Sequence, residues 1–298
     1  MQLEELITEL YVCVDDKIED ILKGKKIRRR GYKPALSDSE VISMELIGEY
    51  LSIDTTKGIW CYFKTHWQGL FPRIGSRSQF DKQSSNTFGL KRELLKRLQL
   101  EAQATSRFYG IVDGYPIPVC KFGRAHFCKK FNLAEQASYG YCAAKKEKYY
   151  GFKGMIGIDR RGIILGETLV PANIDEREAI FDLIEKLPSL TLGDKGFIGK
   201  EFQNYFSQSG KTIVTTMRSN MKAQFNKATQ SWITRHRRLV ETVIGQLTER
   251  FKMNKVWARD SWHLGVRMTR KLIAHTLMVN INLKLNRQPL DFDGILTP

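Results

Sequence analysis

The chain of 298 residues is short of acidic residues and of cysteine. Its 32 Asp and Glu stand against 48 Lys and Arg, which gives a formal net charge of +16. Because a positive field attracts phosphate backbones, this imbalance favours a polyanionic partner such as nucleic acid. The five cysteines are odd in number and dispersed, so a disulfide framework is not expected and a reducing compartment is.

Long apolar runs are also missing. No window of the sequence approaches the roughly 18 consecutive apolar residues that span a bilayer, and the first residues lack the pattern of a secretory leader. Hydrophobic residues nevertheless make up 42% of the chain, enough for a sizeable core. We therefore expect a globular, cytoplasmic protein without a membrane partner.

Four residues in the middle of the chain raise the question of a zinc site. Cys120, His126, Cys128 and Cys142 are of the ligand types that zinc prefers. Their spacing lacks the paired Cys-x-x-Cys pattern of structural zinc sites, so ordinary thiols are the favoured interpretation.

The first 105 residues have the pattern of helices. Ser37 and Glu40 have the spacing of a capping box before an apolar run, and Ser76 with Gln79 repeats this spacing. Between the first two expected helices, residues 23–33 hold seven cations and no acid. Such a run is either a solvated loop or a phosphate-binding loop, and the net charge favours phosphate contact. Its candidate DNA-binding residues are Arg28, Arg29 and Arg30.

From residue 106 to 298 the pattern is that of an α/β domain. Extended segments are expected near 108–120, a hairpin at 149–170, strands at 189–192 and 212–216, and helices between and after them. This order predicts a mixed sheet flanked by helices, in the order of a ribonuclease H-like fold. The preceding helical region, residues 1–105, is expected to bind DNA.

Two aspartates stand where such a sheet would place ligands. Asp113 follows the apolar residues Ile111 and Val112, and an aspartate in an apolar strand is costly unless it is paired or coordinated. Asp194 follows the strand expected at 189–192, at the sheet edge where open α/β folds bind ligands. Each could instead begin an ordinary turn, because Asp next to Gly is common in turns.

The third candidate, Glu241, lies in a strongly basic helix. The apolar stripe of this helix runs through Val240, Val243 and Leu247, and Glu241 lies off it. A solvent-exposed pair with Arg237, four residues earlier, is the alternative. Asp159 is interpreted as a hairpin residue, and Asp175 as the start of a helix whose first turn also holds Glu176 and Glu178.

Three acids in these contexts fit a site for two Mg2+ or Mn2+ ions, because hard ions prefer carboxylate oxygens and paired ions serve phosphodiester chemistry. We therefore assign Asp113, Asp194 and Glu241 as catalytic residues and metal ligands. The candidate phosphate contacts near them are Lys153, Lys195, Arg237, Arg238, Arg250 and Lys252. Trp232 is a candidate for stacking on flipped bases of the DNA, although a core role is more common for large aromatic residues at helical spacing.

Together these motifs resemble the DDE transposases of bacterial insertion sequences. The resemblance rests on Asp113, on Tyr150-Gly-Phe-Lys153, on Asp194-Lys-Gly-Phe197 and on Arg237-x-x-x-Glu241. The stretch from Val112 to Cys142 looks most like the insertion-sequence-982 branch, and the resemblance extends over about residues 30–285.

The resemblance implies a ribonuclease H-like core and binding of terminal inverted repeats of double-stranded DNA by the first helices. It also implies strand cleavage by metal-activated water, joining of the freed 3′-hydroxyl to target DNA, a homodimer on DNA and a place at the bacterial nucleoid. One departure is Thr248, where related transposases often carry a lysine; Arg250 or Lys252 is the expected substitute.

Two other functions remain open on the sequence. One is a ribonuclease H-like nuclease that cleaves without strand transfer. The other is a DNA-binding protein without catalysis, in which the acids only balance nearby cations; it would bind in a salt-sensitive way and give no metal-dependent product.

Overall fold

The computed structural model describes residues 1–25, 27–28, 32–105, 108–129, 131, 137–143, 146–217, 220–221, 224–255 and 257–296. Two of the candidate DNA-binding residues, Arg29 and Arg30, lie outside the described residues. The chain divides into two compact units. The helical unit comprises Met1–Leu98, Glu249–Lys252 and Trp262–Pro298, and the sheet unit comprises Gln99–Thr248 and Met253–Ser261.

The helical unit is built around a helix that is buried on all sides. This central helix, α2 (Asp38–Tyr50), packs against α1 and α3 and against α4, and almost all of its residues are buried. A helix buried all round is typical of a core position. The other helices of the unit are α1 (Leu3–Leu22), α3 (Thr56–His66), α4 (Arg77–Asn86), the first part of α5 (Phe88–Thr105) and most of α9 (Ser261–Lys284).

Both expected capping boxes are confirmed. Ser37 accepts a hydrogen bond from the backbone N–H of Glu40 at the start of α2, and Glu40 accepts one in return. Ser76 and Gln79 do the same at the start of α4. These bonds satisfy backbone donors that a helix leaves open at its N-terminus, which is why the two helices begin where the sequence predicts.

The core of the helical unit contains charged side chains. Lys91 Nζ lies 2.7 Å from Glu45 Oε2, and neither side chain is exposed. Arg270 and Lys271 of α9 pair with Glu49, which is also buried. Because a buried charge is costly without a partner, these pairs tie α2 to α5 and α9.

The sheet unit holds a mixed sheet. Its central strand, β1, is antiparallel to β3 and parallel to β5, and β5 is parallel to β6. The far edge of β3 pairs with β2 along its first half and with β4 along its second. The strands are β1 (Tyr109–Lys121), β2 (Ser138–Cys142), β3 (Glu147–Asp159), β4 (Ile164–Pro171), β5 (Leu190–Gly193) and β6 (Thr212–Thr215).

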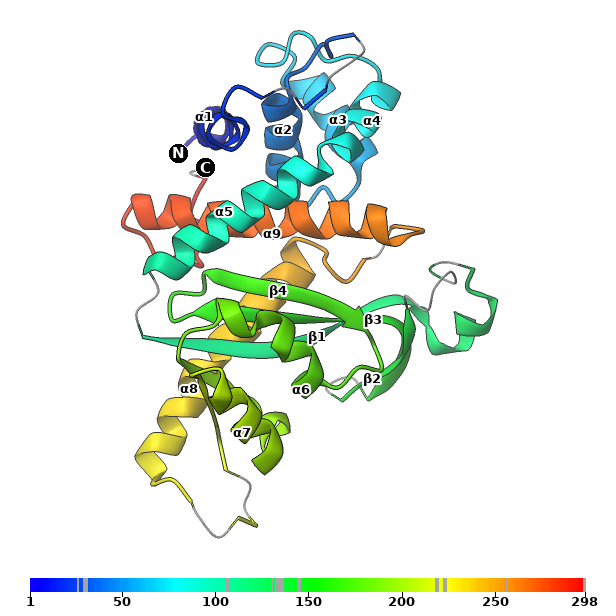
Figure 1. Ribbon diagram of the computed structural model, residues 1–298. Helices are drawn as coiled ribbons and strands as arrows, with labels where there is room; N and C mark the ends of the chain where they lie inside the picture. The colour runs from blue at the N-terminus through cyan, green and yellow to red at the C-terminus, as the bar shows by residue number, and fades with distance from the viewer. Residues whose placement is uncertain are drawn as a thin grey trace. The chain divides into compact units, whose positions relative to one another are not determined.

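Helical segments cover both faces of this sheet, as the sequence predicts (Figure 1). On one face, α6 (Glu176–Ala179), the 3-10 segment η2 (Ile180–Lys186) and α7 (Lys200–Gln208) pack over a core that includes Val112 and Met155. On the other, α8 (Lys227–Gly245) lies against β1 and β5. The mixed α/β architecture is thereby confirmed.

Two local predictions differ from the structure. The helix expected at residues 175–187 is α-helical only over α6 and continues as η2. It ends at Leu187, which is extended because the following Pro188 disfavours a helical conformation before it. Strand β2 was not predicted at all.

None of the helices in the described part of the chain is long and apolar enough to cross a membrane. Nor does any group of three or more His, Cys, Asp or Glu side chains among the described residues have the arrangement of a metal site. Cys120, His126, Cys128 and Cys142 are all among these described residues and form no such group.

Candidate active site

The sheet unit places Asp113, within β1, beside Asp194, which directly follows the carboxyl end of the neighbouring strand β5. Ile111 of β1 is paired with Leu192 of β5, so each aspartate stands two residues beyond the same paired position. Because the strands are parallel, both chains leave this position in the same direction. Asp194 directly precedes the short 3-10 segment η3 (Lys195–Phe197) and makes no side-chain capping bond to it. Gly193 before it lies close to Phe197 and Ile213, where a side chain would not fit.

Arg237 joins the two aspartates. Its Nη2 lies 3.4 Å from Asp113 Oδ2 and its Nη1 lies 3.1 Å from Asp194 Oδ1. The arginine comes from α8, on the face of the sheet opposite α6 (Figure 1). Its side chain is only 14% exposed, and its Nε is buried without a hydrogen-bond partner among the described residues. The guanidinium therefore compensates two carboxylates that the fold places side by side.

Asp113 is the more constrained of the two aspartates. Its Oδ1 accepts a hydrogen bond of 2.8 Å from the backbone N–H of Gly114. Burial raises the pKa of Asp113 to about 6, against the lowering effects of the Gly114 bond and of Arg237. Glu176 and Asp194 add to the rise, because nearby negative charges disfavour ionisation.

The structure adds an acid that the sequence interpretation assigned only to a helix start. Glu176, the first residue of α6, approaches the strand so closely that a Cβ at Gly114 would lie 2.9 Å from its Oε1. A Cβ at Gly196 would lie 3.9 Å from its Oε2. Burial raises the pKa of Glu176, Lys153 opposes the rise, and Asp194 adds to it. The glycines after Asp113 and Asp194 were the available signal, since each allows another chain to come close.

Glu241 lies one helical turn after Arg237 on α8. As predicted, Val240, Val243 and Leu247 are buried while Glu241 is exposed. The described residues include no three acids arranged as a metal site, so the structure does not bring Glu241 into a cluster with Asp113 and Asp194. Its assignment as the third ligand stays a prediction.

The candidate phosphate-binding residues of the sheet unit differ in their exposure to solvent. Lys195 and Arg238 are exposed beside the aspartates and Arg237. Lys153 is mostly buried: its Nζ donates to the carbonyl of Ile174 at 2.8 Å and lies 3.8 Å from Glu176. Lys153 therefore lies beside Glu176, one of the acids of the site, and balances part of its negative charge.

Arg28, Arg250 and Lys252 belong to the helical unit. Arg28 is held by Asp38 through hydrogen bonds of 2.8 and 2.5 Å. Arg250 lies over the ring of Tyr50 and pairs with Asp293. Lys252 has a left-handed backbone, with φ of 53°.

Thr248 stands at the position of the expected lysine. Its hydroxyl donates a hydrogen bond of 2.8 Å to the backbone carbonyl of Ile244, one helical turn earlier.

Comparison with known proteins identifies the family. Residues 103–261, more than half of the chain, match the family model described as a transposase DDE domain. The chain belongs to the DDE transposase family. The resemblance inferred from the acidic motifs is thus confirmed at the level of the family, and this DDE transposase is a DNA-cleaving enzyme of transposition.

One solved structure is similar to this DDE transposase. It is a piggyBac transposase synaptic complex with hairpin DNA, with 11% sequence identity and a TM-score of 0.48. The similarity covers 95% of this chain and 76% of that chain. No curated protein matches the sequence.

Proposed function

We propose that this DDE transposase cleaves DNA at the terminal inverted repeats of a bacterial insertion sequence and joins the 3′-hydroxyl ends to target DNA. The observation that carries the proposal is the bridge from Arg237 to both Asp113 and Asp194. It shows two carboxylates converging at one end of the sheet, within the segment that matches the family.

The donor set fits Mg2+ or Mn2+. Asp113 and Asp194 offer carboxylate oxygens, the ligands that hard divalent ions prefer, and the buried Asp113 ionises more readily next to positive charge. We propose that these two residues and Glu241 hold two ions. Such ions supply a water of lowered pKa and neutralise charge on the leaving oxygen.

Arg237 has two roles in this proposal. In the protein alone, it offsets part of the negative charge of the aspartate pair. With DNA bound, its guanidinium presents several donors in a plane, which suits a phosphate as well as a carboxylate. Lys195 and Arg238, exposed nearby, are proposed to hold adjacent phosphates, and Lys153 to balance Glu176.

Thr248 stands where related transposases often carry a lysine, so another cation has to serve as the basic partner in this chain. Arg250 is engaged with Tyr50 and Asp293 inside the helical unit. Of the two expected substitutes, Lys252 has the less committed side chain, and we propose it as the basic partner.

We further propose a ribonuclease H-like core, membership of the insertion-sequence-982 branch, and action as a dimer on nucleoid DNA. Residues 1–105 are proposed to bind the transposon ends. The cations of residues 23–33, among which Arg28, Arg29 and Arg30 were singled out, support this role because phosphate contacts dominate DNA affinity.

The test uses purified protein, Mg2+ and labelled duplexes that carry the ends of the insertion sequence. Asp113→Asn and Asp194→Asn should abolish strand cleavage and leave DNA binding in place. Glu178→Gln is the matched control, because Glu178 is an exposed acid on the same unit. Cleavage that persists in both aspartate variants would overturn the site. Cleavage without joined products would favour a nuclease that lacks strand transfer.

A further inference from the structure

The helical unit contains a hollow that the catalytic proposal does not use. It lies between the segment before α2 and helix α4, and has a volume of about 500 Å³. A second hollow of about 520 Å³ adjoins it on residues 33–36 and reaches Arg73. These volumes are typical of sites for small ligands and are too small for the width of a duplex.

Hydrogen bonds hold the walls of the hollow together. Gln83 of α4 is buried, and its Nε2 donates to the carbonyl of Leu36 at 3.0 Å and to Asp38 Oδ1 at 2.8 Å. Arg28 binds the same carboxylate from the other side. These contacts link the segment before α2 to α2 itself and to α4. The hollow is therefore already formed in the protein without a ligand.

The charge of the hollow is positive. The only acid among the described lining residues is Asp38, and Arg28 neutralises it. Lys33, Arg73 and Lys82 are exposed, and no ion pair joins any of them to an acid within the described residues. Three positive charges at the rim suit a ligand with a phosphate group.

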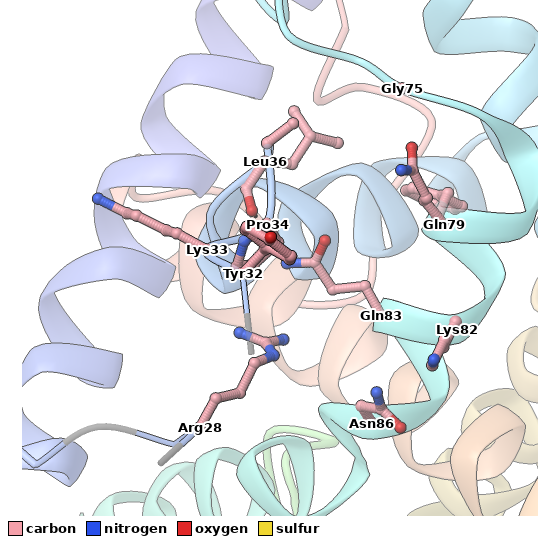
Figure 2. Close-up of a pocket in the computed structure, with 12 residues that line it drawn as sticks. Arg28, Tyr32, Lys33, Pro34, Leu36, Gly75, Gln79, Lys82, Gln83 and Asn86 are labelled. Carbon is pink, nitrogen blue, oxygen red and sulfur yellow. Dashed lines mark hydrogen bonds between the residues drawn. The ribbon is translucent and has the colours of Figure 1, made fainter. Parts of the chain in front are cut away.

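The apolar floor of the hollow and its α4 wall have the chemistry to bind a nucleobase. Pro34, Leu36 and Phe80 line the interior, and the ring of Tyr32 at the rim has a relative exposure of 102%. Figure 2 shows Gln79, Gln83 and Asn86 along α4, which lines the hollow together with Tyr32, Pro34 and Leu36. Because Leu36 and Asp38 already use both N–H groups of Gln83, the exposed Gln79 and Asn86 are the amides that offer donors and acceptors to a base edge. The exposed aromatic ring offers a stacking surface.

We infer that this hollow binds one unpaired nucleotide of a DNA chain, with the base against Tyr32 and the α4 amides and the phosphate near Lys82. The inference rests on the proposal that the helical unit contacts DNA, and it assigns that unit a preference for DNA in which a base is out of the stack. An acidic peptide would match the cations but would leave the amides and the aromatic ring without a specific role.

The experiment compares two DNA duplexes that carry a fluorescent adenine analogue at one position. In one duplex the analogue is base-paired, and in the other it is unpaired. The full chain should bind the unpaired form about tenfold more tightly and quench its fluorescence, as expected for one stacked base. Tyr32→Ala and Lys82→Ala should remove this preference. Both residues are exposed, so folding should be unaffected, which circular dichroism checks. Lys57→Ala, at an exposed cation of α3 outside the hollow, is the matched control and should keep the preference.

Several outcomes would overturn the inference. One is a preference that survives in Tyr32→Ala and Lys82→Ala, and another is its loss in Lys57→Ala. Equal competition by free deoxyadenosine monophosphate would assign the hollow to mononucleotides, and equal competition by polyglutamate would assign it to an acidic peptide. Asp113→Asn, which should not cleave, is expected to keep the preference. Loss of cleavage and loss of the preference are therefore separate results.

Discussion

Arg237 Nη1 lies 3.1 Å from Asp194 Oδ1, and the same guanidinium reaches Asp113. One side chain of α8 thus connects this helix to β1, which holds Asp113, and to the carboxyl end of β5, which Asp194 follows. The Asp194 side chain is half-exposed, but those of Arg237 and Asp113 are mostly buried. The Arg237–Asp113 pair is therefore screened less by solvent than a surface pair, so the ionisation of Asp113 depends on Arg237.

Replacing Arg237 with Gln should shift the acid limb of the pH profile for cleavage upward by about one pKa unit. The guanidinium favours the ionised form of Asp113, and its removal raises the pKa of that carboxyl further above about 6. The measurement is the cleavage rate between pH 5 and pH 9. Arg238→Gln, which removes the same charge from the adjacent exposed position, should weaken DNA binding without moving the limb. A limb unmoved by Arg237→Gln would contradict the coupling.

Asp113 should make the protein less stable as pH rises. Its pKa is raised to about 6 in the folded protein, against about 3.9 in the unfolded chain, so unfolding is favoured once it ionises. The stability conferred by the protonated form is fully present below about pH 4 and is lost as pH passes about 6, by about 3 kcal/mol in total. Asp113→Asn should therefore be more stable than the wild type at pH 8, by about 1 to 3 kcal/mol, and similar at pH 4. Urea unfolding at both pH values tests this, and a less stable variant at pH 8 would refute it.

Glu176 and Glu241 are two candidates for a third acid in the site, and glutamine variants separate them. If Glu241 is the third ligand, Glu241→Gln should lower cleavage by at least about a hundredfold, a loss of nearly 3 kcal/mol of transition-state stabilisation. Glu176→Gln should have a smaller effect and should lower the pKa of Asp113, because it removes a neighbouring negative charge. Glu178→Gln should change neither quantity. A larger loss in Glu176→Gln than in Glu241→Gln would transfer the ligand role to Glu176.

The buried pair of Lys91 and Glu45 should matter more to the helical unit than any surface pair. Lys91→Met leaves the Glu45 carboxylate in the core with less compensation, and should cost about 3 to 5 kcal/mol of the free energy of unfolding. Arg97→Met removes a cation from the exposed pair with Asp20 and should cost at most about 1 kcal/mol. Urea unfolding of the two variants gives the comparison. Equal losses would show that the buried pair is not a special determinant of stability.

Local signals in the sequence predicted many of the elements correctly. The hairpin at Asp159 formed as expected, because its carboxylate accepts hydrogen bonds from the backbone N–H groups of Arg161 and Ile163. The capping boxes at Ser37 and Ser76 act within four residues, and the apolar stripe of α8 depends only on helical period. Each of these features is decided by neighbours in the chain.

Strand β2 shows the opposite case. Its residues, Ser138–Cys142, pair with the first half of β3. Tyr139 and Tyr141 stand two residues apart, the period of a strand, but five residues are too short a run to predict a strand from alternation, and the pairing with β3 decides it. The 3-10 segment η2 was likewise not predicted as such, and its apolar residues pack in the sheet core.

The sequence by itself determined the family, the positive charge and the positions of Asp113 and Asp194, because these depend on residue types and short spacings. Only the tertiary structure showed that Arg237 bridges the two aspartates and that Glu176 lies against Gly114. These residues are far apart along the chain, and the pairing of β1 with β5 and the packing of α6 and α8 on opposite faces of the sheet decide which of them meet.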